Sequence, residues 1–125
     1  MFSNHYSNQT KLPQTAALRR AVAIIGELNL DLIASGLNSP PTLGREVLAE
    51  NLQTVLGSAS AIFACGMAQL GHPVGFFSKV GRDEYGRSCL DFLRKAGVST
   101  KNVHTDPAAR TGVTLSLSTR SDRHW

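Results

Sequence analysis

Two polar side chains follow directly on the first apolar run of the sequence. Asn29 and Asp31 come just after the run Ala21–Ile25, which Gly26 ends. If the chain stays extended, the two-residue period of a strand points both side chains to one side, near the carboxyl end of the preceding strand. Ligands of open α/β sheets bind at that end. The pair is therefore a candidate ligand-binding site.

A second candidate for chemistry is the segment Gly81–Ser88, which has the spacing of a phosphate-binding loop with Arg87 in place of the usual lysine. Such a loop surrounds a phosphate with backbone N–H groups and a cation. Asp83 and Glu84 would bring negative charge to that phosphate, so a turn that caps the next helix is favoured. No Gly-x-Gly-x-x-Gly follows the first apolar run, so a dinucleotide fingerprint is missing as well.

The other residues with catalytic or metal-binding potential are scattered. The histidines have no Ser, Cys or carboxylate partner that the sequence can assign; they are His5, His72, His104 and His124. Cys65 and Cys89 lie in apolar segments, and neither has a second Cys or a His at metal-ligand spacing. They are interpreted as free buried thiols in a reducing cytoplasm, and no metal site is expected.

Length and composition indicate one ordinary globular domain of 125 residues, 42% hydrophobic and 18% charged. The formal charge is +4, but three of the basic residues lie in residues 1–20, which contain no acid. The remaining chain is nearly neutral and lacks the basic face that nucleic-acid binding requires. Residues 1–20 are predicted to be a flexible N-terminal arm, and they contain no apolar core of signal-peptide length.

One segment is long enough to raise the question of a membrane helix. No Lys, Arg, Asp or Glu occurs from Asn51 to Ser78. The segment is interrupted by Gly, Ser and Pro residues, a composition that suits a helix packed closely on a sheet better than a helix in lipid. The chain is therefore not expected to enter a membrane.

The elements that must position these residues begin with Ala21–Ile25, whose continuous apolar run predicts a strand covered on both faces. The segment Ser35–Pro41 has the composition of a turn, and Glu46–Val55 fits either a helix or an edge strand, with the strand favoured. A helix over Ala61–Leu70 follows, with Ser58 or Ser60 as its N-cap and Gly71 at its end.

The next unit repeats this order. Val74–Val80 is predicted to be a strand, and Asp83 caps a helix that Gly97 ends. One face of that helix is predicted to carry Tyr85, Cys89, Phe92 and Ala96. A last strand alternates apolar and polar residues, with Val113, Leu115 and Leu117 on its buried face. The order strand, helix, strand, helix, strand predicts an α/β layered sheet.

Taken together and in order, four segments resemble the N-terminal half of the PfkB-type, or ribokinase-like, sugar kinases. They are Gly26–Asp31, Gly57–Gly71, Val80–Gly86 and Arg110–Thr114. The resemblance covers residues 21–125. It implies a three-layer αβα sheet with a small β lid, incomplete in this chain, whose lid strands lie within about 33–56 and 112–125.

The resemblance implies transfer of the γ-phosphoryl group of ATP, with Mg²⁺, to a hydroxyl of a sugar or nucleoside. Asp31, with Asn29 beside it, would bind substrate hydroxyls, because a carboxylate accepts two hydrogen bonds at once. Gly57 and Ser58 match a glycine pair whose bare backbone lets the sugar approach. The second glycine of the family is Ser58 here, and Ile62 stands where many members have a sugar-binding asparagine, so the identity of the sugar does not carry over.

The general base of the family is an Asp in a Gly-Ala-Gly-Asp-like motif that lies in its second half, and nothing in this chain matches it. The ATP and Mg²⁺ sites belong to that same half. The chain is therefore expected to hold substrate-binding residues, to hold no catalytic, cofactor-binding or metal-binding residues, and to be catalytically silent alone. Members often dimerise through the lid, so a homodimer is an option. The alternatives are a small non-catalytic sugar-binding or interaction module, and a nucleic-acid binder that acts through residues 1–20.

Overall fold

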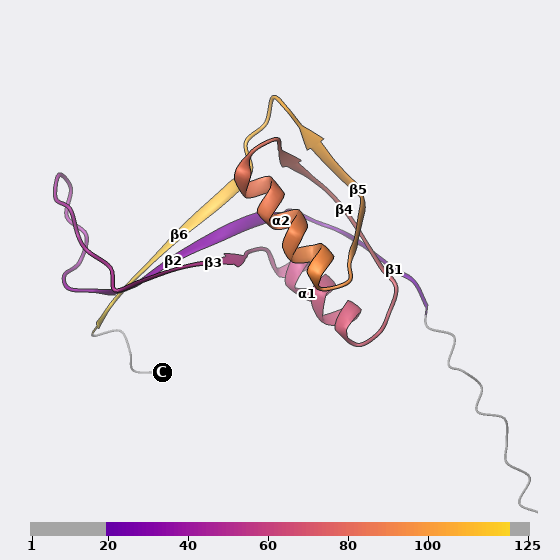
Figure 1. Cartoon of the computed structure of the whole chain (residues 1–125), viewed down its shortest axis with the longest axis horizontal. Helices are drawn as coiled ribbons and strands as arrows, with labels where there is room; N and C mark the ends of the chain where they lie inside the picture. The colour runs from indigo at the N-terminus through magenta and orange to yellow at the C-terminus, as the bar shows by residue number, and fades with distance from the viewer. Residues whose placement is uncertain (1–19, 121–125) are drawn as a thin grey trace, which may run out of the picture.

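Two three-stranded sheets and two helices make up residues 20–120, the part of the chain that this computed structural model describes (Figure 1). The core sheet is parallel and has the order β1 (Val22–Ile25), β4 (Val74–Gly81), β5 (Ser99–Asp106). The outer sheet has the order β3 (Asn51–Leu56), β2 (Asn29–Leu37), β6 (Gly112–Thr119). In it, β2 pairs antiparallel with β3 and parallel with β6. Of the predicted arm, only Arg20 lies within the described residues.

The helices α1 (Ala59–Gln69) and α2 (Glu84–Lys95) cover the same face of the core sheet. One cluster of buried side chains joins both helices to the sheet, including Ile24, Phe76, Val80, Ala61, Ala64, Cys89 and Leu93. Successive right-handed crossovers that advance in one direction place their helices on one face. The prediction that β1 is covered on both faces is therefore wrong for the described residues, and Ile25 is 84% exposed.

Both helix boundaries follow the predicted capping residues. Ser58, rather than Ser60, caps α1, and Gly71 ends it with a φ of 87°. Asp83 caps α2, and Gly97 ends it with a φ of 88°. Glycine adopts this left-handed conformation without a Cβ clash, which is why both helices stop there. Neither of these two described helices has the length and apolar character needed to span a membrane.

Only part of the predicted face of α2 is buried: Cys89 is in the core and Ala96 packs against it. The buried residues of α2 are Gly86, Cys89 and Leu93, while Tyr85 and Phe92 are exposed. The core contacts come from the side of α2 that faces β4, and this side is centred on Cys89 and Leu93. Tyr85 and Phe92 lie at the edge of that face, toward the outer sheet.

Two strands of the outer sheet differ in length from the sequence prediction. β2 runs to Leu37, so Ser35–Leu37 is strand and not turn; it accommodates Gly36, with a φ of 72°, at a shift in its register with β6. β3 is an edge strand, as favoured, but it starts only at Asn51.

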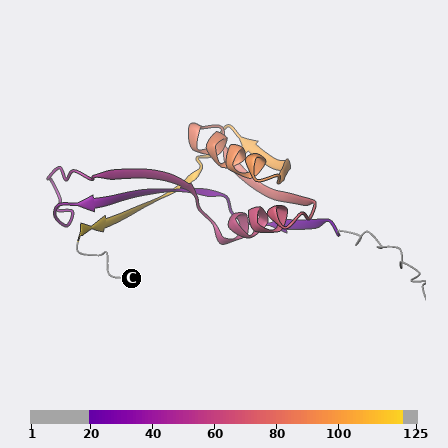
Figure 2. The same ribbon diagram turned by 60° about the horizontal axis from the view of Figure 1, so that its bottom comes forward.

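Two further features of the strands were not expected. The sequence does not predict β5, because the segment STKNVHTD has no apolar alternation. β6 is confirmed as a strand, but its apolar residues are exposed among the described residues, Leu115 at 59%. Figure 2 shows the reason, since the outer sheet reaches beyond both helices. No described helix covers the outer half of this sheet.

Candidate functional site

Asn29 and Asp31 lie together at the start of β2, where the chain leaves the core sheet and enters the outer sheet. Both are half-buried. The Asn29 Nδ2 group donates a hydrogen bond of 3.2 Å to Asp31 Oδ1. The amide thus holds one carboxylate oxygen in place, and the two side chains form one polar unit.

Gly57 packs against this polar unit and leaves no room for a side chain. A Cβ atom at this position would lie 2.5 Å from Asn29 Nδ2 and 2.6 Å from Asp31 Oδ1. The Gly57 N–H also donates to the Asn29 carbonyl at 2.9 Å. The backbone of residue 57 is therefore a wall of the site, and only glycine provides it.

Ser58 follows Gly57, but its side chain turns toward the protein. Its φ of 72° makes it the one described non-glycine residue with a positive φ. Its hydroxyl donates to the Glu27 carbonyl at 2.7 Å and accepts from the Ala61 N–H at 3.2 Å. Ile62, one turn into α1, is mostly exposed and lines an apolar groove together with Leu56 and Phe92. Ile62 itself offers no hydrogen bond, and the side-chain amide that lines the same groove belongs to Gln69.

Polar residues of β6 lie on the same face of the outer sheet as Asp31. Asp31 is paired with Thr114 of β6, and Ile33 is paired with Ser116. Paired residues on neighbouring strands point to the same side, so Thr114 and Ser116 share the face of Asp31. The sequence showed these residues only as the water-facing side of a strand, because the pairing partner of β6 is not visible in it.

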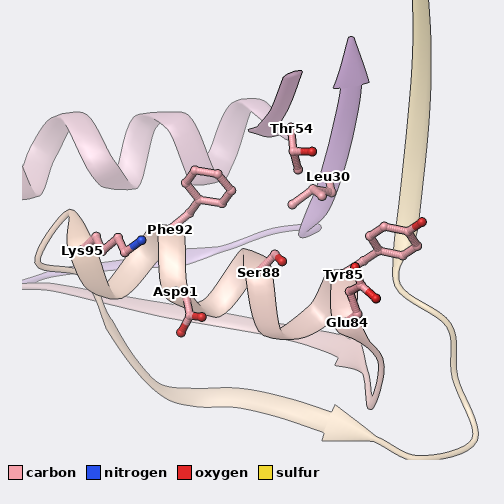
Figure 3. Close-up of a pocket in the computed structure, with 8 residues that line it drawn as sticks. All are labelled: Leu30, Thr54, Glu84, Tyr85, Ser88, Asp91, Phe92 and Lys95. Carbon is pink, nitrogen blue, oxygen red and sulfur yellow. The ribbon is translucent and has the colours of Figure 1, made fainter. Parts of the chain in front are cut away.

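The opposite face of the outer sheet borders a cavity of about 340 Å³ against α2 (Figure 3). Figure 3 shows Phe92 of α2 pointing toward Leu30 and Thr54. Leu30 lies between Asn29 and Asp31 in the strand and therefore points away from both. This cavity thus lies behind the candidate site and is not part of it.

Asp83 joins the end of the core sheet to the start of β6. Its Oδ1 accepts from the Gly86 N–H at 2.8 Å, and its Oδ2 accepts from the Thr111 N–H at 2.9 Å. The hydroxyl of the buried Thr111 accepts from the Gly81 N–H at 2.9 Å. The hydrogen bonds from the Thr111 and Gly86 N–H groups lower the pKa of Asp83 below its ordinary value. The sequence predicted Asp83 as the cap of α2, but it gave no sign of the contact with Thr111.

These bonds also decide whether Gly81–Ser88 fits the phosphates of ATP. The Gly86 N–H, which would contact a phosphate, already donates to the Asp83 carboxylate, and the Arg87 N–H donates to the Asp83 carbonyl. A carboxylate thus occupies the position of the anion, and the segment does not fit a nucleotide phosphate. Within residues 20–120, no three His, Cys, Asp or Glu side chains are grouped so that they could hold a metal ion.

Comparison with known proteins adds independent support for the fold. The chain is 37% identical to ribokinase from Bacillus subtilis (strain 168) over 81 residues, which cover 65% of this chain and 27% of the relative. The structure of Halothermothrix orenii fructokinase matches with a TM-score of 0.65 and 27% identity, covering 82% of this chain and 35% of that one. Aminoimidazole riboside kinase from Salmonella enterica, crystallised with aminoimidazole riboside and an ATP analog, shares the fold with a TM-score of 0.61 and 24% identity, covering 77% and 28%.

The chain spans about a quarter of the length of the curated relatives it matches. The profile of the pfkB family carbohydrate kinases matches residues 19–124, nearly the whole chain. The α/β fold class and the four segments that carried the resemblance agree with this match. The chain belongs to the pfkB family of carbohydrate kinases.

Proposed function

We propose that this chain carries the substrate-binding part of a kinase that phosphorylates a hydroxyl group of a sugar or nucleoside with ATP. The observation that carries the proposal is the joined side-chain pair of Asn29 and Asp31 with the Gly57 backbone against it. A bare backbone lets a flat or ring-shaped ligand approach closely. The carboxylate and the amide then supply its hydrogen bonds.

The pair suits a ligand with neighbouring hydroxyl groups. Asn29 occupies only part of the hydrogen-bonding capacity of the Asp31 carboxylate, which accepts up to about four bonds. The second N–H and the carbonyl of the Asn29 amide add a donor and an acceptor. Two vicinal hydroxyls can therefore each donate to Asp31 while one of them accepts from Asn29, as a sugar or ribose ring allows.

The phosphoryl donor in this proposal is ATP with Mg²⁺, in keeping with the ATP analog in the Salmonella kinase. The family's Gly-Ala-Gly-Asp-like motif, expected to supply the general base and the anion hole, is absent from the 125 residues. We therefore expect the chain alone to bind its substrate without phosphorylating it. With ATP as donor and two free thiols, Cys65 and Cys89, we place the protein in the cytoplasm.

In this proposal the outer sheet acts as the lid of the site. Its polar face, with Asp31 and Thr114, would close over the sugar and exclude water. Its other face exposes the apolar residues Leu115 and Leu117, which would pack against the same face of a second copy. A homodimer through the lid would bury this surface.

Binding to the 125-residue chain tests the proposal directly. D-ribose, D-fructose and adenosine are titrated into the ¹⁵N-labelled chain, and shifts of the Gly57 and Asp31 amide signals are followed. At least one ligand should bind, and Asp31→Asn should weaken its affinity about 10-fold or more, because hydrogen bonds to a charged group contribute about 1.5–3 kcal/mol. Asp91→Asn, which removes an exposed carboxylate on α2, is the matched control and should bind as the wild type does. Failure of all three ligands to bind, or equal affinity of Asp31→Asn, would contradict the proposal.

A kinase assay tests the expected silence of the chain. The chain is incubated with ATP, Mg²⁺ and the ligand that binds, and phosphorylated product is measured by mass spectrometry. We expect none. Turnover that disappears in Asp31→Ala would show that the chain carries the complete site, and the proposal of a substrate-binding part would then be wrong.

A further inference from the structure

Three serine side chains surround the linker Gly26–Leu28, which connects β1 to β2. The Ser58 hydroxyl donates to the Glu27 carbonyl at 2.7 Å, and the Ser78 hydroxyl donates to the Gly26 carbonyl at 2.6 Å. The Ser60 hydroxyl lies 2.8 Å from Ser58 Oγ and 3.3 Å from the Glu27 carbonyl. We call Ser58, Ser60 and Ser78 the serine cluster. It satisfies two consecutive backbone carbonyls that no strand partner reaches.

The hydrogen-bonding capacity of Ser58 is fully used within the cluster. Its single proton goes to the Glu27 carbonyl at the shorter distance, so Ser60 donates the bond between the two hydroxyls. The Ala61 N–H donates to the remaining lone pair of Ser58 Oγ. One donated and two accepted bonds saturate a hydroxyl, so the Ser58 side chain has no hydrogen bond left for a substrate.

The backbone of Ser58 points to the same interpretation. A φ of 72° is rare for a residue with a side chain, and glycine would adopt it without strain. The three hydrogen bonds of the hydroxyl hold the residue in this conformation. A Cβ at Gly26 would collide with the Ser60 side chain, so the linker and the cluster pack in direct contact.

We infer that the serine cluster positions Asn29 and Asp31, which we call the binding pair, and that the Ser58 hydroxyl acts as a positioning group rather than as a ligand of the substrate. The cluster fixes Gly26 and Glu27, the buried Leu28 anchors the next position, and Asn29 follows immediately. The Gly57 N–H holds the Asn29 carbonyl from the other side. These contacts fix the backbone on both sides of Asn29, and they thereby fix the orientation of the Asn29 and Asp31 side chains at the start of β2. The consequence for sugar affinity rests on the proposed function.

The first test needs no ligand and uses the ¹⁵N-labelled 125-residue chain. In Ser58→Ala the Ala61 amide should exchange with solvent about 10-fold faster, because it loses its acceptor, and the Asn29 side-chain amide signals should shift. Ser58→Gly removes the backbone strain together with the hydroxyl, and the Asn29 signals should still shift. If Ser58→Gly gave the wild-type Asn29 signals, the hydroxyl would have no positioning role and the inference would be overturned.

Ser78→Ala separates positioning from helix capping, because Ser78 bonds to the linker but not to α1. It should move the Asn29 side-chain signals and leave the Ala61 exchange rate unchanged. Ser99→Ala, at an exposed position at the start of β5, is the control and should change neither. Unchanged Asn29 signals in both Ser78→Ala and Ser60→Ala would refute the inference.

The second test uses the polyol that binds the wild type. Ser58→Ala and Ser78→Ala should each weaken its affinity about 3-fold to 10-fold. A direct ligand role for Ser58 predicts a loss in Ser58→Ala alone, and that outcome would overturn the inference. If the wild type binds no polyol, the proposed function fails, while the Asn29 signals still decide whether the cluster positions the pair.

Discussion

The two sheets of this chain differ in how their apolar residues are covered. In the core sheet, Phe76 is fully buried beneath α1 and α2. In the outer sheet, Leu52 is 69% exposed, and the apolar residues of β6 are exposed as well. The face of the core sheet beneath the helices is stabilised by packing, whereas the outer sheet depends largely on its own backbone hydrogen bonds.

The two sheets are joined where the candidate site lies. Leu28 and Leu30 extend the core to the first residues of β2. Beyond these two leucines, the contacts between the two sheets are polar. They are the hydrogen bonds of the serine cluster on one side and the bond between Asp83 and Thr111 on the other. Asn29 and Asp31 thus lie at the boundary between a sheet packed under two helices and a sheet whose apolar residues are largely exposed.

The largest expected effect is the loss of stability when a buried side chain of the core sheet is truncated, compared with the same change at an exposed side chain of the outer sheet. Phe76→Ala should lower the free energy of unfolding by about 3–5 kcal/mol, because it removes a fully buried ring. Leu52→Ala, on the exposed face of β3, should change it by no more than about 0.5 kcal/mol. Urea denaturation followed by circular dichroism measures both. Equal losses would show that the outer sheet is as well packed as the core sheet.

The second prediction concerns the boundary between the two sheets, where Gly57 packs against Asn29 and Asp31. Gly57→Ala should destabilise the chain by about 1–3 kcal/mol and displace the Asn29 side chain, since the new methyl group overlaps the binding pair. Gly66→Ala in α1 is the matched control, because a Cβ there meets nothing within 4 Å. It should stabilise the helix by about 1 kcal/mol. Thermal melts of the two variants should shift in opposite directions, and a shared direction would contradict the contact at Gly57.

The third prediction is that the stability supplied by the hydrogen bonds of Asp83 is lost in acid. Because the pKa of Asp83 is lowered in the folded chain, the unfolded chain binds its proton first as the pH falls. The stabilisation is therefore complete above the ordinary pKa of 3.8 and is lost as the pH falls through the lower, folded value. The urea midpoint of the wild type should fall between about pH 5 and pH 2.

Asp83→Asn should have a lower midpoint at pH 6 and a flatter dependence toward acid, because its amide cannot accept from both the Gly86 and Thr111 N–H groups. Asp106 also has a lowered pKa, caused first by the Ala108 N–H and then by Lys79, and accounts for a remaining slope. An unchanged slope in Asp83→Asn would assign the acid dependence to other carboxylates.

The smallest effect on stability is expected from substitutions of the exposed apolar residues of β6. Leu115→Ser should change the free energy of unfolding by no more than about 0.5 kcal/mol, since the residue is exposed. If the exposed apolar face of the outer sheet mediates a dimer, Leu115→Ser should weaken self-association in sedimentation velocity runs at increasing concentration. A wild-type chain that stays monomeric at all concentrations would exclude the proposed dimer.

The sequence predicted those parts of the fold that depend on local chemistry. Ser58, Gly71, Asp83 and Gly97 mark helix ends through their own side chains or conformations, and these boundaries are confirmed. β5 has no such signal, because its strand conformation depends on pairing with β4. The adjacency of Asn29 and Asp31 followed from strand periodicity.

The rest of the site could not be predicted, since it depends on contacts between distant segments. The hydroxyl of Ser58 reaches Glu27, and the carboxylate of Asp83 reaches Thr111. Nothing in the local sequence specifies these partners. The positive φ of Ser58 was hidden for the same reason, because serine by itself predicts a cap and not an unusual backbone.

The parallel pairing of β2 with β6 has a consequence for the order of folding. Asn29 is paired with Gly112, about 80 residues later in the chain, and both helices and two strands of the core sheet lie between them. Closing so long a loop is entropically unfavourable until the intervening elements have already shortened it. During synthesis β6 leaves the ribosome after every other described strand. The face of the outer sheet that carries Asn29 and Asp31 is therefore completed last, because Gly112 and Thr114 are the strand partners of these two residues.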